Sequence, residues 1–342
     1  MRVELLTDLQ AIKSLEEPWE DLVEARGLAR SSAALVNAWG RHYRTQSRSL
    51  HVWVAWHDDL PVGMLALSAR TTRDGALEYV AAGEGAIFGL LPVTAPELEL
   101  EVAEAVAGAL AGADQRAERL ELHWLPRHSR WTQAFASALV ERGWALEAKT
   151  TYLSPWIDLA SGGFEGWLHR RSPHFASNLA RRGRRLAEMG FERRSTSDPA
   201  EIAANVPRLR ELYVSRQSER GGGGGYRFDA PMSALIIDAV ADARPGRFSL
   251  ATLARPGEVI AASLSVAAGG RRSGWLAGFD QAWSSFGPGY QAVAAAVEHG
   301  ALCGDRLLDL GTGGEAYKEE ILDGASVLET WRWAAPGVAG DR

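Results

Sequence analysis

The strongest constraint on the fold of this chain is an internal repeat. Residues 50–79 contain three apolar segments separated by turn sequences at residues 58–59 and 73–75, and residues 248–278 contain three more, separated at residues 256–257 and 269–270. Short β-prone segments joined by Asp-, Gly- and Pro-containing turns are typical of antiparallel meanders. The chain therefore contains the same three-strand motif twice.

The elements that follow each meander also match. A helical pattern over residues 97–110 precedes a strand at 119–124, and a helical pattern over residues 290–302 precedes a strand at 306–310. A chain of 342 residues is also longer than one core usually fills. We expect an α+β fold of two tandem domains, residues 1–157 and 158–342, each with a mixed, mostly antiparallel sheet flanked by helices.

Composition excludes several classes of protein. The formal net charge of −6 argues against a general polyanion-binding surface. A single cysteine, Cys303, excludes an intrachain disulfide and a cysteine-based zinc site. His123 and His128 have no carboxylate partner at ligand spacing, so no metal is expected. Residues 1–20 lack the apolar core of a signal peptide, and no run of about 18 apolar residues occurs. We expect a cytoplasmic monomer with no membrane insertion.

A glycine turn and a cluster of ionisable residues follow the second meander. Gly287-Pro-Gly289 leads into the helical pattern, and a helix N-terminus favours bound phosphate. Glu315, Tyr317 and Lys318 come soon after the next strand. The combination suggests an enzyme with a phosphorylated donor, although a turn and a helix start also account for the glycines.

These elements in this order resemble the doubled members of the GNAT acyltransferase superfamily. Gly-Pro-Gly-Tyr at 287–290, Leu-Leu-Asp-Leu at 307–310 and Glu-Ala-Tyr-Lys at 315–318 are similar to the CelD-like acetyltransferases associated with cellulose biosynthesis. That family is related to the FemXAB peptidyltransferases. The resemblance covers nearly the whole chain and implies two GNAT-like domains. The first is degenerate, because residues 88–94 lack the second glycine, so one donor site is expected in the second domain.

The resemblance implies where the donor binds. In GNAT folds the coenzyme A pyrophosphate rests on backbone N–H groups of a Gln/Arg-x-x-Gly-x-Gly/Ala loop. The matching positions here are Ser284, Gly287 and Gly289, with serine where a long donor side chain is expected. The implied cofactor-binding residues are Ala277, Gly278, Ser284, Gly287, Gly289 and Tyr290.

The resemblance also implies the catalytic groups. Tyr317 occupies the position of the tyrosine that protonates the departing sulfur, and Lys318 that of a cation near the donor. Backbone N–H groups near Ala277 and Gly278 would stabilise the carbonyl oxygen. Asp280 or Glu315 is the candidate base. Packing alone also accounts for Tyr317, and solvation for Glu315 and Lys318.

The implied activity is transfer of an acyl group from acyl-CoA, such as acetyl-CoA, to a small-molecule or saccharide amine, and two other functions stay open. A basic helix over residues 175–189 and the segment just before it carry arginines at 170, 171, 181, 182, 184 and 185. Such a patch suits tRNA phosphates, as in aminoacyl-tRNA-dependent FemXAB enzymes. It also suits a solvated surface, or one arginine that binds a coenzyme phosphate. With Ser284, the chain could instead be a non-catalytic accessory protein of polysaccharide or natural-product biosynthesis.

A methyltransferase is excluded on topology. Residues 308–314 imitate the glycine motif of enzymes that bind S-adenosylmethionine, but that motif belongs on the first strand of a doubly wound sheet. Only 28 residues follow Gly314, too few for the β/α units that such a sheet requires.

Overall fold

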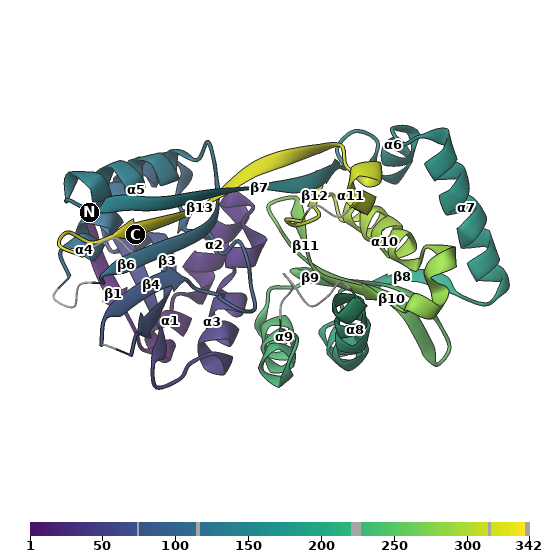
Figure 1. Cartoon of the computed structure of the whole chain (residues 1–342), viewed down its shortest axis with the longest axis horizontal. Coiled ribbons are helices and arrows are strands. Elements are labelled where there is room, and N and C mark those ends of the chain that lie inside the picture. The colour runs from purple at the N-terminus through teal and green to yellow at the C-terminus, as the bar shows by residue number, and fades with distance from the viewer. Residues whose placement is uncertain (74, 114–116, 220–226, 314–315, 339–342) are drawn as a thin grey trace. The chain divides into compact units, whose positions relative to one another are not determined.

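Both predicted meanders are present in the computed structural model, which describes residues 1–73, 75–113, 117–219, 227–313 and 316–338 (Figure 1). Strands within each meander pair antiparallel. The first consists of β2 (Arg48–His57), β3 (Leu60–Thr71) and β4 (Leu77–Ala81), and the second of β9 (Phe248–Arg255), β10 (Glu258–Ala268) and β11 (Arg271–Phe279). The repeat seen in the sequence is therefore a repeat of strand pairing.

A two-residue turn closes at least one hairpin of each meander, in a conformation that suits its residues. Asp58 and Asp59, between β2 and β3, have φ values of 47° and 63°, and Gly269 and Gly270, between β10 and β11, have values of 55° and 72°. Positive φ at both central residues is type I′ geometry, whose twist matches that of the flanking strands. Glycine adopts this conformation freely, and aspartate tolerates it better than most residues.

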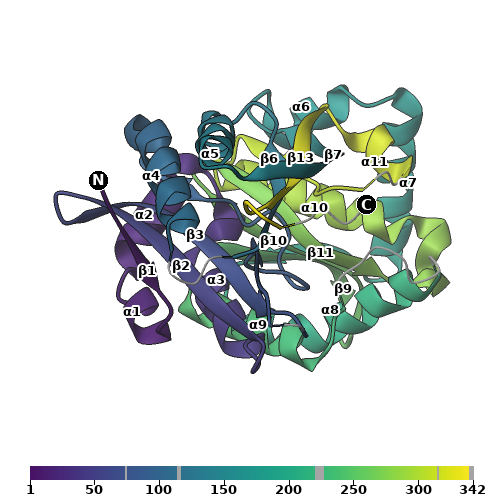
Figure 2. The same cartoon turned by 60° about the vertical axis from the view of Figure 1, so that its left-hand side comes forward.

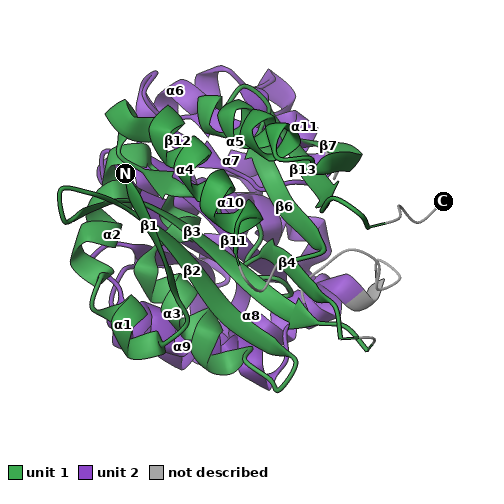
Figure 3. Ribbon diagram, turned by 90° about the vertical axis from the view of Figure 1, so that its left-hand side faces the viewer, with its two compact units in different colours: residues 1–152, 327–342 green, residues 153–326 purple. Residues whose placement is uncertain are grey.

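The first of two units comprises Met1–Tyr152 and Val327–Arg342 (Figure 3). Its strands follow the order β1-β2-β3-β4-β6-β13, with β4 and β6 parallel and the other neighbours antiparallel, and β5 pairs with β3. The further strands are β1 (Arg2–Leu6), β5 (Val93–Thr94), β6 (Arg119–Pro126) and β13 (Gly324–Ala334). The helices are α1 (Leu9–Lys13), α2 (Glu16–Arg26), η1 (Ala29–Ser31), α3 (Ala33–His42), η2 (Pro96–Leu98), α4 (Glu99–Ala111) and α5 (Arg130–Glu141).

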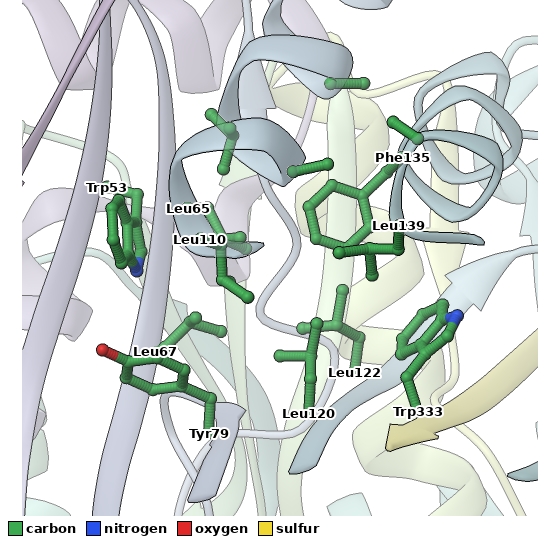
Figure 4. Packing of buried hydrophobic residues seen from close by; sticks show 14 of the residues in the cluster. Trp53, Leu65, Leu67, Tyr79, Leu110, Leu120, Leu122, Phe135, Leu139 and Trp333 are labelled. Carbon is green, nitrogen blue, oxygen red and sulfur yellow. The ribbon is translucent and has the colours of Figure 1, made fainter. Parts of the chain in front are cut away.

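The core of the first unit lies between its sheet and two helices. Helix α4 packs against β2 and β3 (Figure 2), and α5 packs beside α4. Alternate strand residues and the apolar faces of these helices meet there, including Trp53, Leu67, Leu110, Phe135 and Trp333 (Figure 4). Burial of such side chains stabilises the fold by about 1.5–3 kcal/mol each.

The second unit comprises Leu153–Ser326, and its strands follow the order β7-β12-β11-β10-β9-β8. Strands β11 and β12 are parallel, and the other neighbours are antiparallel. Helix α10 covers one face of the meander, and α8 and α9 cover the other (Figures 1 and 2). The further elements are β7 (Ala145–Asp158), α6 (Gly163–His169), α7 (Pro173–Glu188), β8 (Glu192–Thr196), α8 (Pro199–Glu219), α9 (Ala230–Asp242), η3 (Gln281–Phe286), α10 (Pro288–Leu302), β12 (Leu307–Asp309) and α11 (Ala316–Ile321).

The units divide the chain differently from the boundary expected between residues 157 and 158. The division falls at residues 152 and 153, within β7. Residues 327–342, expected in the second domain, belong to the first unit, because β13 pairs with β6 from Leu328 to Ala334. An alternating apolar pattern predicts a strand but does not identify the strand with which it pairs.

Candidate functional site

The predicted glycine turn forms the N-terminus of α10. Gly287 has the left-handed conformation, with φ 62° and ψ 50°, and joins η3 to α10; Pro288 and Gly289 are the first helical residues. The first turn of a helix has N–H groups without intrahelical partners, and the helix dipole is positive there. No acidic residue lies in the first turn of α10, so the end of this helix favours an anion.

A cavity of about 400 Å³ lies beside this turn, within the second unit. Its wall consists of glycines, apolar side chains and a few polar groups from seven elements. Seven of the ten predicted site residues line it: Ala277, Gly278, Ser284, Gly287, Gly289, Tyr290 and Tyr317. The structure therefore brings together residues that span 41 positions of the sequence.

The cavity lies where β11 continues beyond β12. Within the described residues, β11 pairs with β12 only from Arg271 to Ser273, whereas its pairing with β10 continues to Phe279. The cavity lining includes residues 277–279, from the part of β11 that has separated from β12. A backbone segment that diverges from its neighbour in a sheet can offer hydrogen bonds to an extended ligand.

Gly278 has a packing role in addition to its place in the cavity wall. A Cβ atom added there would lie 2.4 Å from the backbone carbon of Leu212 and 2.4 Å from the backbone nitrogen of Tyr213. The backbone of α8 therefore approaches β11 so closely that only glycine fits at this position.

We expect Gly278→Ala to lower the free energy of unfolding by about 1–3 kcal/mol, because α8 must move away from β11 to admit the methyl group. Gly274→Ala on the same strand is the matched control, because the added Cβ would lie 3.4 Å from its nearest neighbour, the backbone oxygen of Asp309. Denaturant unfolding of both variants tests the prediction. Equal stability of the two variants would show that the close approach of α8 does not restrict the side chain that fits at position 278.

Tyr317 lies against two other side chains that line the cavity. Its ring packs edge-on against Tyr290, with centroids 6.1 Å apart, and the Arg216 guanidinium carbon lies 5.6 Å from its ring centroid. Arg216 also donates a hydrogen bond of 3.2 Å from Nη1 to the backbone oxygen of Ala277. Arg216 thus links α8 both to the separated part of β11 and to the predicted acid.

Tyr290 forms a wall of the site and keeps its proton at neutral pH. Its hydroxyl donates to the Glu320 carboxylate at 2.8 Å, and its ring packs edge-on against Phe175. Burial, reinforced by the hydrogen bond to Glu320, raises the pKa of Tyr290 to about 12. These contacts suit Tyr290 to orienting a ligand rather than exchanging protons.

The other three predicted site residues are not among those that line the cavity. Lys318 is 4% exposed, and its Nζ donates to the backbone oxygens of Gly311 and Thr312, each at 3.0 Å. Asp280 caps η3 by accepting from the Ala282 N–H, and its other oxygen lies 3.3 Å from Arg208. Glu315 lies outside the described residues.

Several residues of the cavity wall were not among the predicted site residues: Arg182, Arg216, Ala262, Ser263, Phe279, Gln281, Pro288, Ala292 and Val293. Of these, Arg182 belongs to the basic helix, one of whose arginines was a candidate for binding a coenzyme phosphate. The two arginines are the charged members of this set, and they come from α7 and α8, far from the glycine turn in sequence. No local motif marks an arginine whose contact depends on how two helices pack.

The basic helix predicted from the sequence is α7, and its arginines have different environments. Arg170 and Arg171, just before α7, both contact the Asp323 carboxylate. Arg181 donates to Asn178, and Arg184 and Arg185 are exposed. Arg182 is half-buried and lines the cavity. The six arginines therefore do not form one uniform basic surface.

Within the described residues, no group of three or more His, Cys, Asp or Glu side chains is arranged to hold a metal ion. Among those same residues, no helix is both long and apolar enough to cross a lipid bilayer.

The cavity, the glycine turn and the separated part of β11 all lie in the second unit. Residues 173–319 match the family model described as an acetyltransferase (GNAT) domain, so the second unit contains a GNAT acetyltransferase-type domain. The expected fold class is confirmed in that the structure has one large sheet, mostly antiparallel and flanked by helices, rather than a separate sheet in each unit. No curated protein matches the chain.

Solved structures share this fold over nearly the whole chain. FemX is similar with a TM-score of 0.63 and 10% identity, over 97% of each chain. The C-terminal domain of an Agrobacterium fabrum protein assigned as a lysylphosphatidylglycerol synthetase has a TM-score of 0.55 and 13% identity, over 95% of this chain and 92% of that one. A Bacteroides thetaiotaomicron protein of unknown function has a TM-score of 0.55 and 12% identity, over 98% of this chain and 100% of that one. At these identities the likeness concerns the fold alone.

Proposed function

We propose that this protein transfers an acyl group, such as acetyl, from acyl-CoA to an amine by direct attack in a ternary complex. The observation that supports this most is one cavity that connects the N-terminus of α10, the separated part of β11 and Tyr317. A phosphate site, a backbone edge and a proton donor are the three parts that a thioester donor requires. All three lie within the segment that matches the GNAT acetyltransferase model.

In the proposed complex, the donor phosphates bind at residues 287–290 and the thioester lies along residues 277–278. The amine nitrogen attacks the carbonyl carbon, the C–S bond breaks, and the coenzyme leaves as a thiolate that takes the proton of Tyr317. Backbone N–H groups near Ala277 and Gly278 stabilise the charge that develops on the carbonyl oxygen. A base takes the extra proton from the amine nitrogen and this proton restores Tyr317, so the sum of the steps is an amide and free coenzyme A.

A base must remove the extra proton from the amine, and our candidates are Asp280 and Glu315. The Asp280 carboxylate is engaged by the Ala282 N–H and by Arg208, so it must leave these contacts to act on an acceptor. Glu315 precedes α11 by one residue and Tyr317 by two. Substituting each carboxylate separately with its amide would show which of the two is the base, because only the loss of the base lowers turnover.

Donor binding is the first test of this proposal. We expect acetyl-CoA to bind in calorimetric titration, and a concentration about 100 times the dissociation constant to stabilise the fold by about 2.7 kcal/mol. Release of free thiol with a panel of small and saccharide amines would then identify the acceptor. ATP is the control for nucleotide binding in general. An absence of binding to acetyl-CoA, longer acyl-CoA and free coenzyme A would contradict the proposal.

The second candidate is an aminoacyl-tRNA-dependent transferase of FemXAB type. The fold likeness to FemX over both units supports this alternative, as do the exposed arginines of α7. Two of the six arginines contact Asp323, which weakens the case for a continuous phosphate-binding surface. Binding of tRNA with a steep salt dependence, together with no binding of acyl-CoA, would favour this function.

A non-catalytic accessory protein of polysaccharide or natural-product biosynthesis is the remaining candidate, and the sequence resemblance to CelD-like proteins is its basis. Ser284 is exposed and lines the cavity, in the place where a longer side chain is expected. Donor binding without turnover on any amine would favour this function over acyl transfer.

A further inference from the structure

Helix α7 has a polar cap and an apolar stripe that determine which of its arginines faces the donor cavity. The Ser172 hydroxyl accepts from the Phe175 N–H at 3.1 Å, and Pro173 occupies the first turn. Phe175, Leu179 and Leu186 are the buried residues of the helix, at the 3.6-residue spacing of one face. The remaining positions include the arginines, of which Arg182 lies at the edge of the apolar stripe.

Close packing holds α7 beside the first turn of α10. Gln291, in α10, is 2% exposed, and its Nε2 donates to the backbone oxygen of Leu179 at 2.9 Å. A Cβ atom added at Gly183 would lie 3.4 Å from the Gln291 side-chain oxygen. Arg182 precedes Gly183 in the helix, so the packing of Gly183 against Gln291 positions the Cα atom of Arg182 beside α10.

The Arg182 side chain covers the left-handed glycine of the turn. A Cβ atom added at Gly287 would lie 2.8 Å from Nη1 and 3.5 Å from Cδ of Arg182. Arg182 lines the donor cavity and also a neighbouring groove of about 670 Å³, and the two share Gly287 and Tyr290 as well. The guanidinium therefore stands where the cavity opens toward the groove, next to the positive end of α10.

The charges around this opening leave Arg182 available to an anion. No carboxylate among the described residues forms an ion pair with Arg182. The groove contains two acids of α11, Glu319 and Glu320, and the second accepts the hydrogen bond from Tyr290. A half-buried guanidinium with no carboxylate partner binds phosphate well, because its planar N–H groups match two phosphate oxygens.

We infer that Arg182 binds the pyrophosphate of the donor and replaces the long side chain that is absent at position 284. The inference rests on the proposed function, since it assigns one contact to the proposed donor. The Ser284 side chain is too short to surround a pyrophosphate. Arg182 approaches Gly287, the first glycine of the turn, from a different helix. The cation for the phosphate comes from α7, more than 100 residues before the turn.

The test compares Arg182→Gln with Arg181→Gln. Both substitutions remove one positive charge from α7, but Arg181 is exposed and donates to Asn178 instead of facing the cavity. Calorimetric titration uses three probes: coenzyme A, dephospho-coenzyme A, which lacks the 3′-phosphate, and pantetheine, which lacks all phosphates. We expect Arg182→Gln to weaken both phosphorylated probes about 10- to 100-fold and to leave pantetheine unchanged, with Arg181→Gln close to wild type.

Three results would overturn the inference. Wild-type affinity of Arg182→Gln for coenzyme A would remove Arg182 from the site. Equal losses of affinity in Arg182→Gln and Arg181→Gln would indicate that the overall positive charge of α7 attracts the donor, without a specific contact from Arg182. A loss for coenzyme A but not for dephospho-coenzyme A would move the contact to the 3′-phosphate. If the wild-type protein binds none of the three probes, the proposed function itself fails, which is distinct from all three results.

Discussion

Tyr317→Phe should lower the turnover number of acyl transfer about 100-fold and leave the dissociation constant of the donor unchanged. The substitution removes only the hydroxyl, so the ring keeps its edge-on contact with Tyr290 and its position beneath Arg216. General acid catalysis contributes roughly 10²–10⁴-fold to a rate, and loss of the proton donor leaves an unprotonated thiolate as the leaving group. An unchanged dissociation constant with a lower turnover number is the signature of an interaction made in the transition state.

Steady-state kinetics and calorimetry on the same preparation check this prediction. Tyr152→Phe is the matched control, because Tyr152 is partly exposed and belongs to the first unit, whereas the donor cavity lies in the second. A turnover number for Tyr317→Phe equal to wild type would exclude its hydroxyl as the acid. A rate loss that disappears with an acyl thioester of a more acidic thiol would confirm that the missing proton goes to sulfur.

The elements that could be predicted from the sequence are those set by local patterns. The turn residues and alternating apolar positions of the two meanders mark strands that form as expected, and Gly287-Pro-Gly289 marks the start of α10. The candidate site depends on the order of these elements as well, because the GNAT resemblance places Ala277 on the third strand of the meander, Gly287 before the helix and Tyr317 after the next strand. Site residues with fixed places in that order can therefore be predicted from the sequence.

The remaining features depend on packing between distant segments. The Arg216 contact with Ala277 joins positions 61 apart in the sequence, and the Arg182 contact with Gly287 joins positions still further apart. The strand β13 pairs with β6 of the first unit although about 200 residues separate them. Such contacts follow from the tertiary arrangement, which residue periodicity does not determine.

Lys318 shows how a residue in the right motif can have a structural role. Its ammonium group is buried and donates to two carbonyl oxygens of residues 311 and 312, in the segment that follows β12. A buried ammonium that donates to carbonyl oxygens stabilises the conformation of that segment, since charged hydrogen bonds contribute about 1.5–3 kcal/mol each. We therefore expect Lys318→Met to lower the free energy of unfolding by about 3 kcal/mol.

Denaturant unfolding and donor titration of Lys318→Met separate this role from the one that the motif suggests. Lys13→Met is the matched control, because it also removes one positive charge but from an exposed position. If Lys318 acts only on the reacting groups, its substitution lowers turnover while the unfolding midpoint stays that of Lys13→Met. If Lys318 stabilises the segment that follows β12, the unfolding midpoint falls. Donor affinity falls with it, because that segment leads into α11 and Tyr317. The burial of Lys318 and its two carbonyl partners favour the second result.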